Sequence, residues 1–112
     1  MDCIFCKIAA HDIPAKIVLE TDQVVVIHDI APKAKVHVLV IPKQHLVTFT
    51  DLTNENKVIM AELGMVVKQV VQQLGIAESG YKVVINNGHD GGQAVPHLHL
   101  HVLGGEKVKG VT

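Results

Sequence analysis

Three histidines alternate with leucines in the run HLHLH, which occupies residues 97–101. Successive side chains of a β-strand point to opposite faces, so a strand here would present all three imidazoles on one face, roughly 7 Å apart. The intervening leucines would then enter a core. A helix would instead turn His99 away from the other two rings. We therefore expect a strand whose polar face is used for chemistry, because polar groups are seldom concentrated on one strand face.

Two kinds of chemistry fit three neighbouring imidazoles. Neutral rings could hold a catalytic zinc ion, since a His-x-His pair on a strand supplies two metal ligands. Alternatively, the central ring could attack phosphorus while its neighbours donate a proton and orient it. A free histidine is mostly neutral at pH 7 and able to attack. One strand would then supply both the nucleophile, His99, and a hydrogen-bond donor to the phosphate and leaving group, His101.

The glycine-rich segment 87–93 stands directly before the histidines and favours phosphate chemistry. Gly88, Gly91 and Gly92 allow positive φ angles, so several backbone N–H groups of residues 91–95 can turn toward one point. Such a nest binds anions, above all phosphate. We therefore expect an anion to lie beside the nucleophile.

Composition limits what else the protein can be. We expect one domain over residues 1–112, since 48% of the residues are hydrophobic and can form a core. The net charge is -1 and aromatic residues make up 3%, so we expect no nucleic-acid or membrane partner. The first residues lack the features of a signal peptide, and the apolar runs are too short to cross a bilayer. A cytoplasmic protein is the expectation.

The segments around these motifs predict an α+β fold with a five-stranded antiparallel sheet, because β-branched runs alternate with short turns and one long helix covers a face. Thr53 is expected to cap that helix, with Glu55 in its first turn and Gly75 just after its end. An apolar stripe at helical spacing predicts a core or subunit contact: Ile59, Leu63, Val66, Val67, Val70, Val71 and Leu74. The other expected elements are a short helix over residues 3–10 and strands over residues 16–20, 24–29, 37–41, 81–86 and 97–103.

The histidine run and further motifs together resemble the histidine triad (HIT) family of nucleotide-binding proteins and hydrolases. The similarity extends over nearly the whole chain and includes residues 4–8, 13–14, 28–30, 37–43, 86, 91–93 and 97–103. The ending Leu103-Gly104-Gly105 resembles the branch of small nucleoside phosphoramidate hydrolases. The resemblance implies the HIT fold, with two sheets joined in a homodimer through the long helix and the strand at residues 81–86.

This resemblance implies a purine nucleoside phosphoramidase. His99 would attack the α-phosphorus of a nucleoside 5′-phosphoramidate or a mixed aminoacyl phosphate, form a nucleotidyl-histidine, and release AMP or GMP after hydrolysis. His101 would contact the leaving group and a phosphate oxygen. His37 would support the triad and help to hold the nucleophile's ring, and His97 would be the first triad member. No cofactor is needed for catalysis in this scheme.

Substrate contacts follow from the same resemblance. Asp29 would accept hydrogen bonds from the ribose hydroxyls, because a carboxylate suits a diol. The residues that resemble the base-enclosing positions are Phe5, Ile8, Ile13, Ile27, His28 and Ile30. The residues that would surround the phosphate are Asn86, Gly92, Gln93, Ala94 and Val95.

Ala94 departs from many members of this branch, which carry a hydroxyl residue there that helps to bind the leaving atom. The departure leaves open a second function, that of a nucleotide-binding regulatory protein with vestigial hydrolysis. Hydrolysis of dinucleoside polyphosphates, used by a sister branch, is a third, although the Gly104-Gly105 ending fits it less well.

Cys3 and Cys6 form a C-x-x-C pair at the start of the chain. Two unpaired thiols, one of them buried, are one interpretation, because free cysteine is often buried. A thioredoxin-like redox pair is disfavoured, since no βαβ unit accompanies the motif. The resemblance to zinc-binding relatives adds His45 and His97 and implies a structural zinc ion, for which a tetrahedral Cys₂His₂ set is suited.

Overall fold

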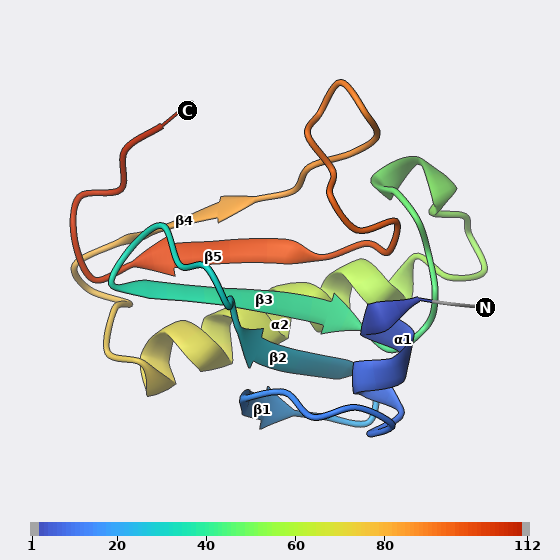
Figure 1. Cartoon of the computed structure of the whole chain (residues 1–112), viewed down its shortest axis with the longest axis horizontal. Coiled ribbons are helices and arrows are strands. Elements are labelled where there is room, and N and C mark those ends of the chain that lie inside the picture. Colours follow the sequence, from blue (N-terminus) through green and yellow to red (C-terminus); the bar gives the residue numbers. More distant parts are fainter. Residues whose placement is uncertain (1–2, 111–112) are drawn as a thin grey trace.

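The computed structural model describes residues 3–110. They form a five-stranded sheet with strand order β1-β2-β3-β5-β4, in which every neighbouring pair is antiparallel. Two α-helices and a short 3-10 helix complete the fold (Figure 1). The predicted α+β class and the antiparallel sheet are confirmed. The elements are α1 (Ile4–Ala9), β1 (Ile17–Glu20), β2 (Val24–His28), β3 (Val36–Pro42), η1 (Phe49–Asp51), α2 (Val58–Gln73), β4 (Tyr81–Val84) and β5 (Leu100–Gly104).

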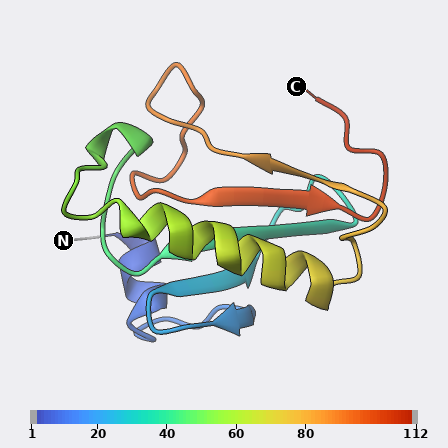
Figure 2. The same ribbon diagram turned by 180° about the vertical axis from the view of Figure 1, so that it is seen from behind.

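Helix α2 covers one face of the sheet (Figure 2). Alternate residues of the strands point toward it, because successive side chains of a strand face opposite ways. Val26, Val38 and Val102 are fully buried there, in one cluster with Leu63 and Val70 of the helix. Burying one such side chain contributes about 1.5–3 kcal/mol. The predicted apolar stripe of α2 therefore lies in the core.

The opposite face of the sheet is covered only in part, by α1 at one end (Figure 1). Phe5 and Ile8 of this helix pack with Leu39 in a second apolar cluster. His37 and His101 stand on the same face as Leu39, because they alternate with strand residues that are buried under α2. The fold thus presents these histidines on the more open face.

Strand β5 begins at Leu100, so the predicted start at His97 is wrong. Pairing with β3 ends at Leu100, and the N–H of Leu98 instead donates to the carbonyl of Leu46 at 2.6 Å. The N–H of His97 turns back to the carbonyl of Val95 at 2.8 Å. Side chains still alternate between the two faces here, although the backbone is not paired with β3. Leu98 is buried in the core under α2, while His97 and His99 contact the ring of Phe5 in α1.

Helix α2 begins at Val58, and not after Thr53 as predicted. The hydroxyl of Thr53 accepts the N–H of Glu55 at 3.3 Å and donates to the Glu55 carboxylate at 3.1 Å, so it closes a turn ahead of the helix. Lys57 is the residue at the N-cap, and Glu55 lies outside the first turn. Gly75 follows the helix with a φ of 72°, as predicted. No helix within residues 3–110 combines the length and apolar character needed to cross a membrane.

Candidate active site and metal centre

His99 is held by a short hydrogen bond to the main chain. Its Nδ1 lies 2.7 Å from the carbonyl oxygen of His97. Because a carbonyl oxygen can only accept, Nδ1 carries the proton and Nε2 of the neutral ring keeps its lone pair. The ring is 5% exposed and packs edge-on against Phe5, with the centroids 5.0 Å apart. His99 is thus in the tautomer that a nucleophile acting through Nε2 requires.

A second chain of hydrogen bonds fixes the proton of His101. The N–H of Lys33 donates to Nδ1 of His37 at 3.1 Å, so the proton of a neutral His37 ring stands on Nε2. That Nε2 lies 2.9 Å from Nδ1 of His101. His101 therefore accepts at Nδ1 and carries its own proton at Nε2. The centroids of the His99 and His101 rings lie 5.1 Å apart, so a lone pair and a donor occupy neighbouring rings.

Burial keeps the His37 and His101 rings neutral. It lowers the pKa of His37 more than the nearby Asp29 carboxylate raises it. Burial is also the main cause for His101, followed by the neighbouring His99 and His37 rings, and it lowers the pKa of His101 to about 4. At pH 7 the His37 and His101 rings therefore each hold one proton, as the tautomers above require.

The contact made by His37 differs from the expectation. We expected this residue to help hold the ring of the nucleophile, His99. Its Nε2 instead bonds to His101, and its other ring nitrogen is taken by the main chain at Lys33. His37 therefore orients the ring of His101, the hydrogen-bond donor next to His99.

Asp29 lies next to this group, just after β2. Its Oδ1 accepts the N–H of Ala31 at 2.8 Å, and its Oδ2 lies 3.5 Å from Nε2 of His37. The side chain is largely buried and lines a cavity. The carboxylate is thus anchored at one oxygen and placed where it can accept hydrogen bonds from a ligand.

The cavity has a volume of about 800 Å³ and is lined by α1, the end of β2 and the loop before β3. Its walls also include His37 and are largely apolar, as is usual for sites that bind organic rings. Predicted substrate residues that line it are Ile8, Ile13, Ile27, His28, Asp29 and Ile30. Lining residues for which no role in the site was predicted are Ile4, Pro14, Ala15, Lys16, Pro32 and Lys35.

Phe5 does not line the cavity, although it was predicted to enclose a base. It is 6% exposed and stands edge-on to both His97 and His99, with centroid distances of 5.9 Å and 5.0 Å. Phe5 is therefore a packing residue between α1 and the histidines. The additional lining residues lie near predicted ones in the sequence, with Ile4 beside Phe5 and the others near Ile13 or Ile30, and their own types give no signal.

Gln93 ties the glycine-rich segment together with both ends of its side-chain amide. Its Nε2 donates to the carbonyls of Val47 and Val95, at 2.6 Å and 3.0 Å, and its Oε1 accepts the N–H of Gly88 at 2.8 Å. We expected this amide near the phosphate. These three bonds instead use it to hold the loop, next to Ala94, which is exposed.

Glycines shape the same loop in two ways. Gly88 and Gly92 have φ angles of 71° and 76°, as expected, whereas the expectation of a positive φ is wrong for Gly91. Only glycine fits at position 91 without a clash, because an added Cβ would lie 2.3 Å from the carbonyl oxygen of Asn87. Asn86 donates from Nδ2 to the carbonyl of Gly91 at 2.8 Å, and β4 ends two residues earlier than predicted.

Four potential metal ligands converge at the N-terminal end of the domain. Nδ1 of His97 lies 3.3 Å from Sγ of Cys3, 3.5 Å from Sγ of Cys6 and 3.0 Å from Nδ1 of His45. Sγ of Cys6 and Nδ1 of His45 lie 3.2 Å apart. Ligand atoms of a tetrahedral zinc site lie about 3.3–3.8 Å apart, given Zn–N and Zn–S bonds of about 2.0 and 2.3 Å. The sequence-predicted Cys₂His₂ set therefore fits zinc.

The second nitrogen of His97 completes this arrangement. Nε2 lies 2.8 Å from the carbonyl oxygen of Pro42, a contact that was not predicted. Its proton must point at that carbonyl, so Nδ1 is left with the lone pair that a metal needs. Burial lowers the pKa of His97, which favours the neutral ring.

Asp29, His37 and His101 also bring three potential ligand atoms within 4.8 Å of one another. Their hydrogen bonds argue against a metal there. Nδ1 of His37 accepts the N–H of Lys33, so its Nε2 carries the proton and has no lone pair to offer. This group is accordingly a hydrogen-bonded chain, and the two clusters have different chemistry.

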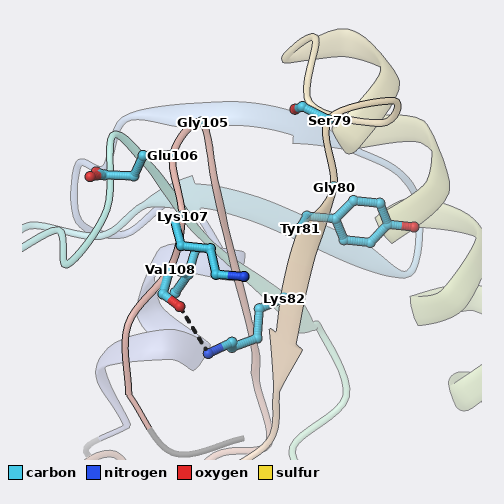
Figure 3. Close-up of a pocket in the computed structure, with 8 residues that line it drawn as sticks. All are labelled: Ser79, Gly80, Tyr81, Lys82, Gly105, Glu106, Lys107 and Val108. Atoms are coloured by element: carbon cyan, nitrogen blue, oxygen red, sulfur yellow. Dashed lines mark hydrogen bonds between the residues drawn. The ribbon is translucent and has the colours of Figure 1, made fainter.

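A second cavity, of about 550 Å³, lies where β4 meets residues 105–108 (Figure 3). Nζ of Lys82 donates to the carbonyl of Val108 at 3.4 Å, and the ring of Tyr81 points away from that contact. None of the histidines lines this cavity. The larger cavity includes His37 and Asp29 in its lining, whereas His99 and His101 are not among its lining residues.

Sequence comparison places these features in a family. The profile of the HIT domain matches residues 10–108. An uncharacterized HIT-like protein of Synechococcus elongatus is 46% identical over 107 residues, which amount to 96% of this chain and 93% of that protein.

Solved structures agree with the sequence comparison. A HIT family hydrolase from Legionella pneumophila superimposes with a TM-score of 0.92 at 40% identity, covering 95% of each chain. A histidine triad nucleotide-binding protein from Candida albicans gives a TM-score of 0.82 at 32% identity, covering 99% of this chain and 86% of that one. A zinc-bound histidine triad family protein from Mycobacterium smegmatis gives 0.78 at 36% identity, covering 97% and 81%. The chain belongs to the HIT domain family.

Proposed function

We propose that this protein is a purine nucleoside phosphoramidase that works through a covalent nucleotidyl-histidine at His99. The observation that supports the proposal is the pair of fixed tautomers, with a lone pair on Nε2 of His99 and a proton on Nε2 of His101. Similarity to a HIT family hydrolase and to a nucleotide-binding histidine triad protein supports a nucleotide substrate. The adjacent cavity of about 800 Å³ is large enough for a nucleoside.

In the first step, Nε2 of His99 attacks the α-phosphorus of a nucleoside 5′-phosphoramidate. The P–N bond to the amine breaks as the new P–Nε2 bond forms, and the departing nitrogen takes a proton from water. The N–H of His101 donates a hydrogen bond to the leaving group and a phosphate oxygen. Because His101 is neutral, it stabilises the developing charge by hydrogen bonding.

In the second step, water attacks the same phosphorus, the P–Nε2 bond breaks, and the electron pair returns to His99. The surplus proton passes to solvent, and AMP or GMP leaves. The imidazole of the intermediate carries a positive charge while both of its nitrogens are substituted. The carbonyl of His97 accepts a hydrogen bond from the Nδ1–H group at this stage and stabilises that charge.

The other residues that were predicted to contact the substrate have the following roles in this proposal. Asp29 accepts hydrogen bonds from the ribose hydroxyls, and the base lies among the apolar residues of the cavity. The backbone around Gly92, Ala94 and Val95 surrounds the phosphate. Asn86 and Gln93 hold that backbone in place through their side-chain amides.

The test is the release of nucleoside monophosphate from an adenosine phosphoramidate. His99→Ala is expected to abolish release while binding of AMP remains measurable by calorimetry. His11→Asn is the matched control, because this histidine bonds on the surface to Glu20 and lies outside the cavity lining. Retained turnover in His99→Ala would refute the mechanism. Tight AMP binding with very slow turnover in the wild type would favour the regulatory alternative that Ala94 suggests.

We further propose a structural zinc ion held by Cys3, Cys6, His45 and His97. The donor set, the distances between the ligand atoms and the zinc-bound relative from Mycobacterium smegmatis support it. Zinc would supply four strong bonds between α1, the segment after β3 and the segment before β5. It has no part in the two chemical steps.

The same proposal includes a homodimer. Strand β4 stands at one edge of the sheet, where unpaired backbone groups can pair with another chain. Tyr81 and Val83 of this strand and Val58 and Met65 of α2 are exposed apolar side chains. Two copies would cover these surfaces and join two sheets into one. Sedimentation of a monomer at micromolar concentration would contradict the dimer.

A further inference from the structure

Glu106 lies at a corner where the sheet meets a loop that forms part of the wall of the larger cavity. Strands β3 and β5 pair as far as Val36 and Gly104. The chain then turns at Gly105, which has a φ of 79°. One residue later, Oε2 of Glu106 accepts the N–H of Lys35 at 2.7 Å, although 71 positions separate the two in sequence. A side-chain carboxylate thus takes the place of the next backbone acceptor along the ladder.

The loop joined to this corner consists of residues 29–35, between β2 and β3. Ile30, Pro32 and Lys35 of the loop line the cavity. Packing contributes little to the position of the loop, since residues 30–33 and Lys35 are exposed. Its position therefore depends on where its backbone N–H groups donate.

Two other N–H groups of the loop donate close by in sequence. The N–H of Lys33 reaches Nδ1 of His37 at 3.1 Å, and that of Ala31 reaches Oδ1 of Asp29 at 2.8 Å. These two bonds give the loop its shape and join it to its own strand, β3. The bond to Glu106 is different, because its acceptor follows the neighbouring strand, β5.

The corner itself has little freedom to move. Gly104 is buried and pairs with β3 on one side and with Tyr81 of β4 on the other. A Cβ added to Gly105 would lie 3.2 Å from Cβ of Lys35 and from Cγ2 of Val36, so the backbone here already packs against the start of β3. The carboxylate one residue later therefore extends from a fixed point.

We propose that Glu106 is a positioning residue for nucleoside binding, because its carboxylate holds the loop of residues 29–35 where that loop forms the cavity wall. In Figure 3 this carboxylate points away from Lys82 and Lys107, so it serves the loop and not these two neighbouring lysines. The inference rests on the proposed function, since it takes the cavity of about 800 Å³ as the nucleoside site. It extends that proposal to a residue outside the lining of the cavity.

The bond to Glu106 acts on binding more than on the chemical steps. It ends at Lys35, a residue of the cavity wall, whereas the N–H of Lys33 keeps its own bond to His37. One hydrogen bond changes an equilibrium by a factor of about 2–10. Glu106→Ala is therefore expected to raise the Kd for AMP and the KM for an adenosine phosphoramidate by about 2- to 10-fold, and to change kcat by less than about twofold.

The direction of this effect separates the hydrogen bond from the charge. Removal of a carboxylate by itself favours an anionic ligand such as AMP, so the loss of charge alone lowers the Kd. Glu106→Gln loses the same charge but keeps an oxygen that accepts the N–H of Lys35. We expect its Kd for AMP and its KM to lie at or below the wild-type values. Glu78→Ala, which removes another exposed carboxylate outside both cavity linings, is the matched control and should not raise either value.

Three measurements test the inference. Calorimetry gives the Kd for AMP, steady-state kinetics give KM and kcat, and hydrogen exchange reports on the loop without any ligand. The peptide that covers residues 29–35 is expected to exchange faster in Glu106→Ala than in the wild type or in Glu106→Gln. Val70→Ala, which truncates a fully buried side chain of α2, controls for a general loss of stability. It is expected to lower the melting temperature and to leave the Kd for AMP and the KM unchanged.

An unchanged Kd for AMP in Glu106→Ala, or an equally raised Kd in Glu106→Gln, would overturn the inference and leave the proposed function intact. A raised Kd without faster exchange of residues 29–35 would also overturn it, since the loop would not have moved. A wild type that binds AMP but shows no turnover, with Glu106→Ala binding AMP more weakly as expected, would overturn the proposed phosphoramidase activity and support the positioning role.

Discussion

Nδ1 of His99 lies 2.7 Å from the carbonyl oxygen of His97, two residues earlier in the chain. This bond gives the first histidine of the HLHLH run a supporting role and the second a reactive one. The three rings that were expected to act side by side therefore belong to two sites. His97 faces the thiols, while His99 and His101 face each other with complementary tautomers.

Replacing His37 tests the second chain of hydrogen bonds. His37→Leu removes the group that donates to Nδ1 of His101, so the proton of His101 is free to move to Nδ1. Loss of one buried hydrogen bond costs about 1–3 kcal/mol, which corresponds to roughly a 10- to 100-fold loss in kcat. Single-turnover kinetics with an adenosine phosphoramidate measure it.

His37→Gln is the matched variant, because its side-chain amide keeps a donor near the position of Nε2. It is expected to retain more activity than His37→Leu. Equal activity of His37→Leu and the wild type would show that the tautomer of His101 does not matter.

Metal analysis tests the Cys₂His₂ centre. Protein purified without chelator is expected to contain one zinc ion per chain, and removal of the metal is expected to lower the melting temperature by about 10 °C or more. Cys3→Ser should reduce the zinc content, whereas His89→Ala, a fully exposed histidine in the loop before the triad, should not. A metal-free preparation that takes up no zinc and melts at the same temperature would contradict the centre.

Most of the fold was accessible from the sequence because its signals are local. The β-branched, apolar runs within residues 24–28 and 36–42 predict buried strands, and the helical stripe that includes Leu63 and Val70 predicts the buried face of α2. The starts of α2 and β5 were missed for a different reason. Thr53 closes a turn with Glu55, and the N–H of Leu98 finds the distant carbonyl of Leu46, so neither boundary is set by its own segment.

The candidate site divides in the same way. Residue types and spacing identified the Cys-x-x-Cys pair and the HLHLH run, and the family resemblance added His37, His45 and Asp29. The structure forms two clusters from them: Cys3, Cys6, His45 and His97 in one, and Asp29, His37 and His101 in the other. The hydrogen-bond partners of the site residues were not predictable, because they lie on loops whose path is not determined by the local sequence. Gln93 turning both amide atoms to the backbone, and the N–H of Lys33 selecting the tautomer of His37, are examples.

The buried histidines predict a stability that falls in acid. An unfolded histidine has a pKa of about 6.5, whereas burial lowers the pKa of folded His101 to about 4. Between these values the unfolded chain binds more protons than the folded one, so the free energy of unfolding decreases as the pH falls. Above a pH of about 6.5 this stabilising contribution is present in full.

His101→Asn removes the titrating ring from that balance. The drop in melting temperature between pH 7 and pH 5 should be smaller in this variant than in the wild type, by about a few degrees. Circular dichroism at both pH values measures the difference. Identical drops would mean that His101 does not resist protonation in the folded protein.

Gly91→Ala tests the loop that precedes the histidines. An added Cβ would meet the backbone oxygen of Asn87 at 2.3 Å, which forces the loop to move at a cost of about 1–3 kcal/mol. We expect weaker AMP binding and a lower melting temperature. Gly64→Ala in α2 is the control, since nothing lies within 4 Å of its added Cβ and stability should rise by about 0.5–1 kcal/mol. Unchanged AMP affinity in Gly91→Ala would separate the loop from the phosphate.

The covalent intermediate is the most direct test of the account. Protein mixed with an adenosine phosphoramidate, unfolded at alkaline pH within the first turnover and digested, is analysed by mass spectrometry. The peptide that contains residues 97–103 is expected to carry one adenylyl group, located on His99 and absent from the His99→Ala variant. An adenylyl group on a different residue, or full turnover with no adduct at any time, would contradict the account.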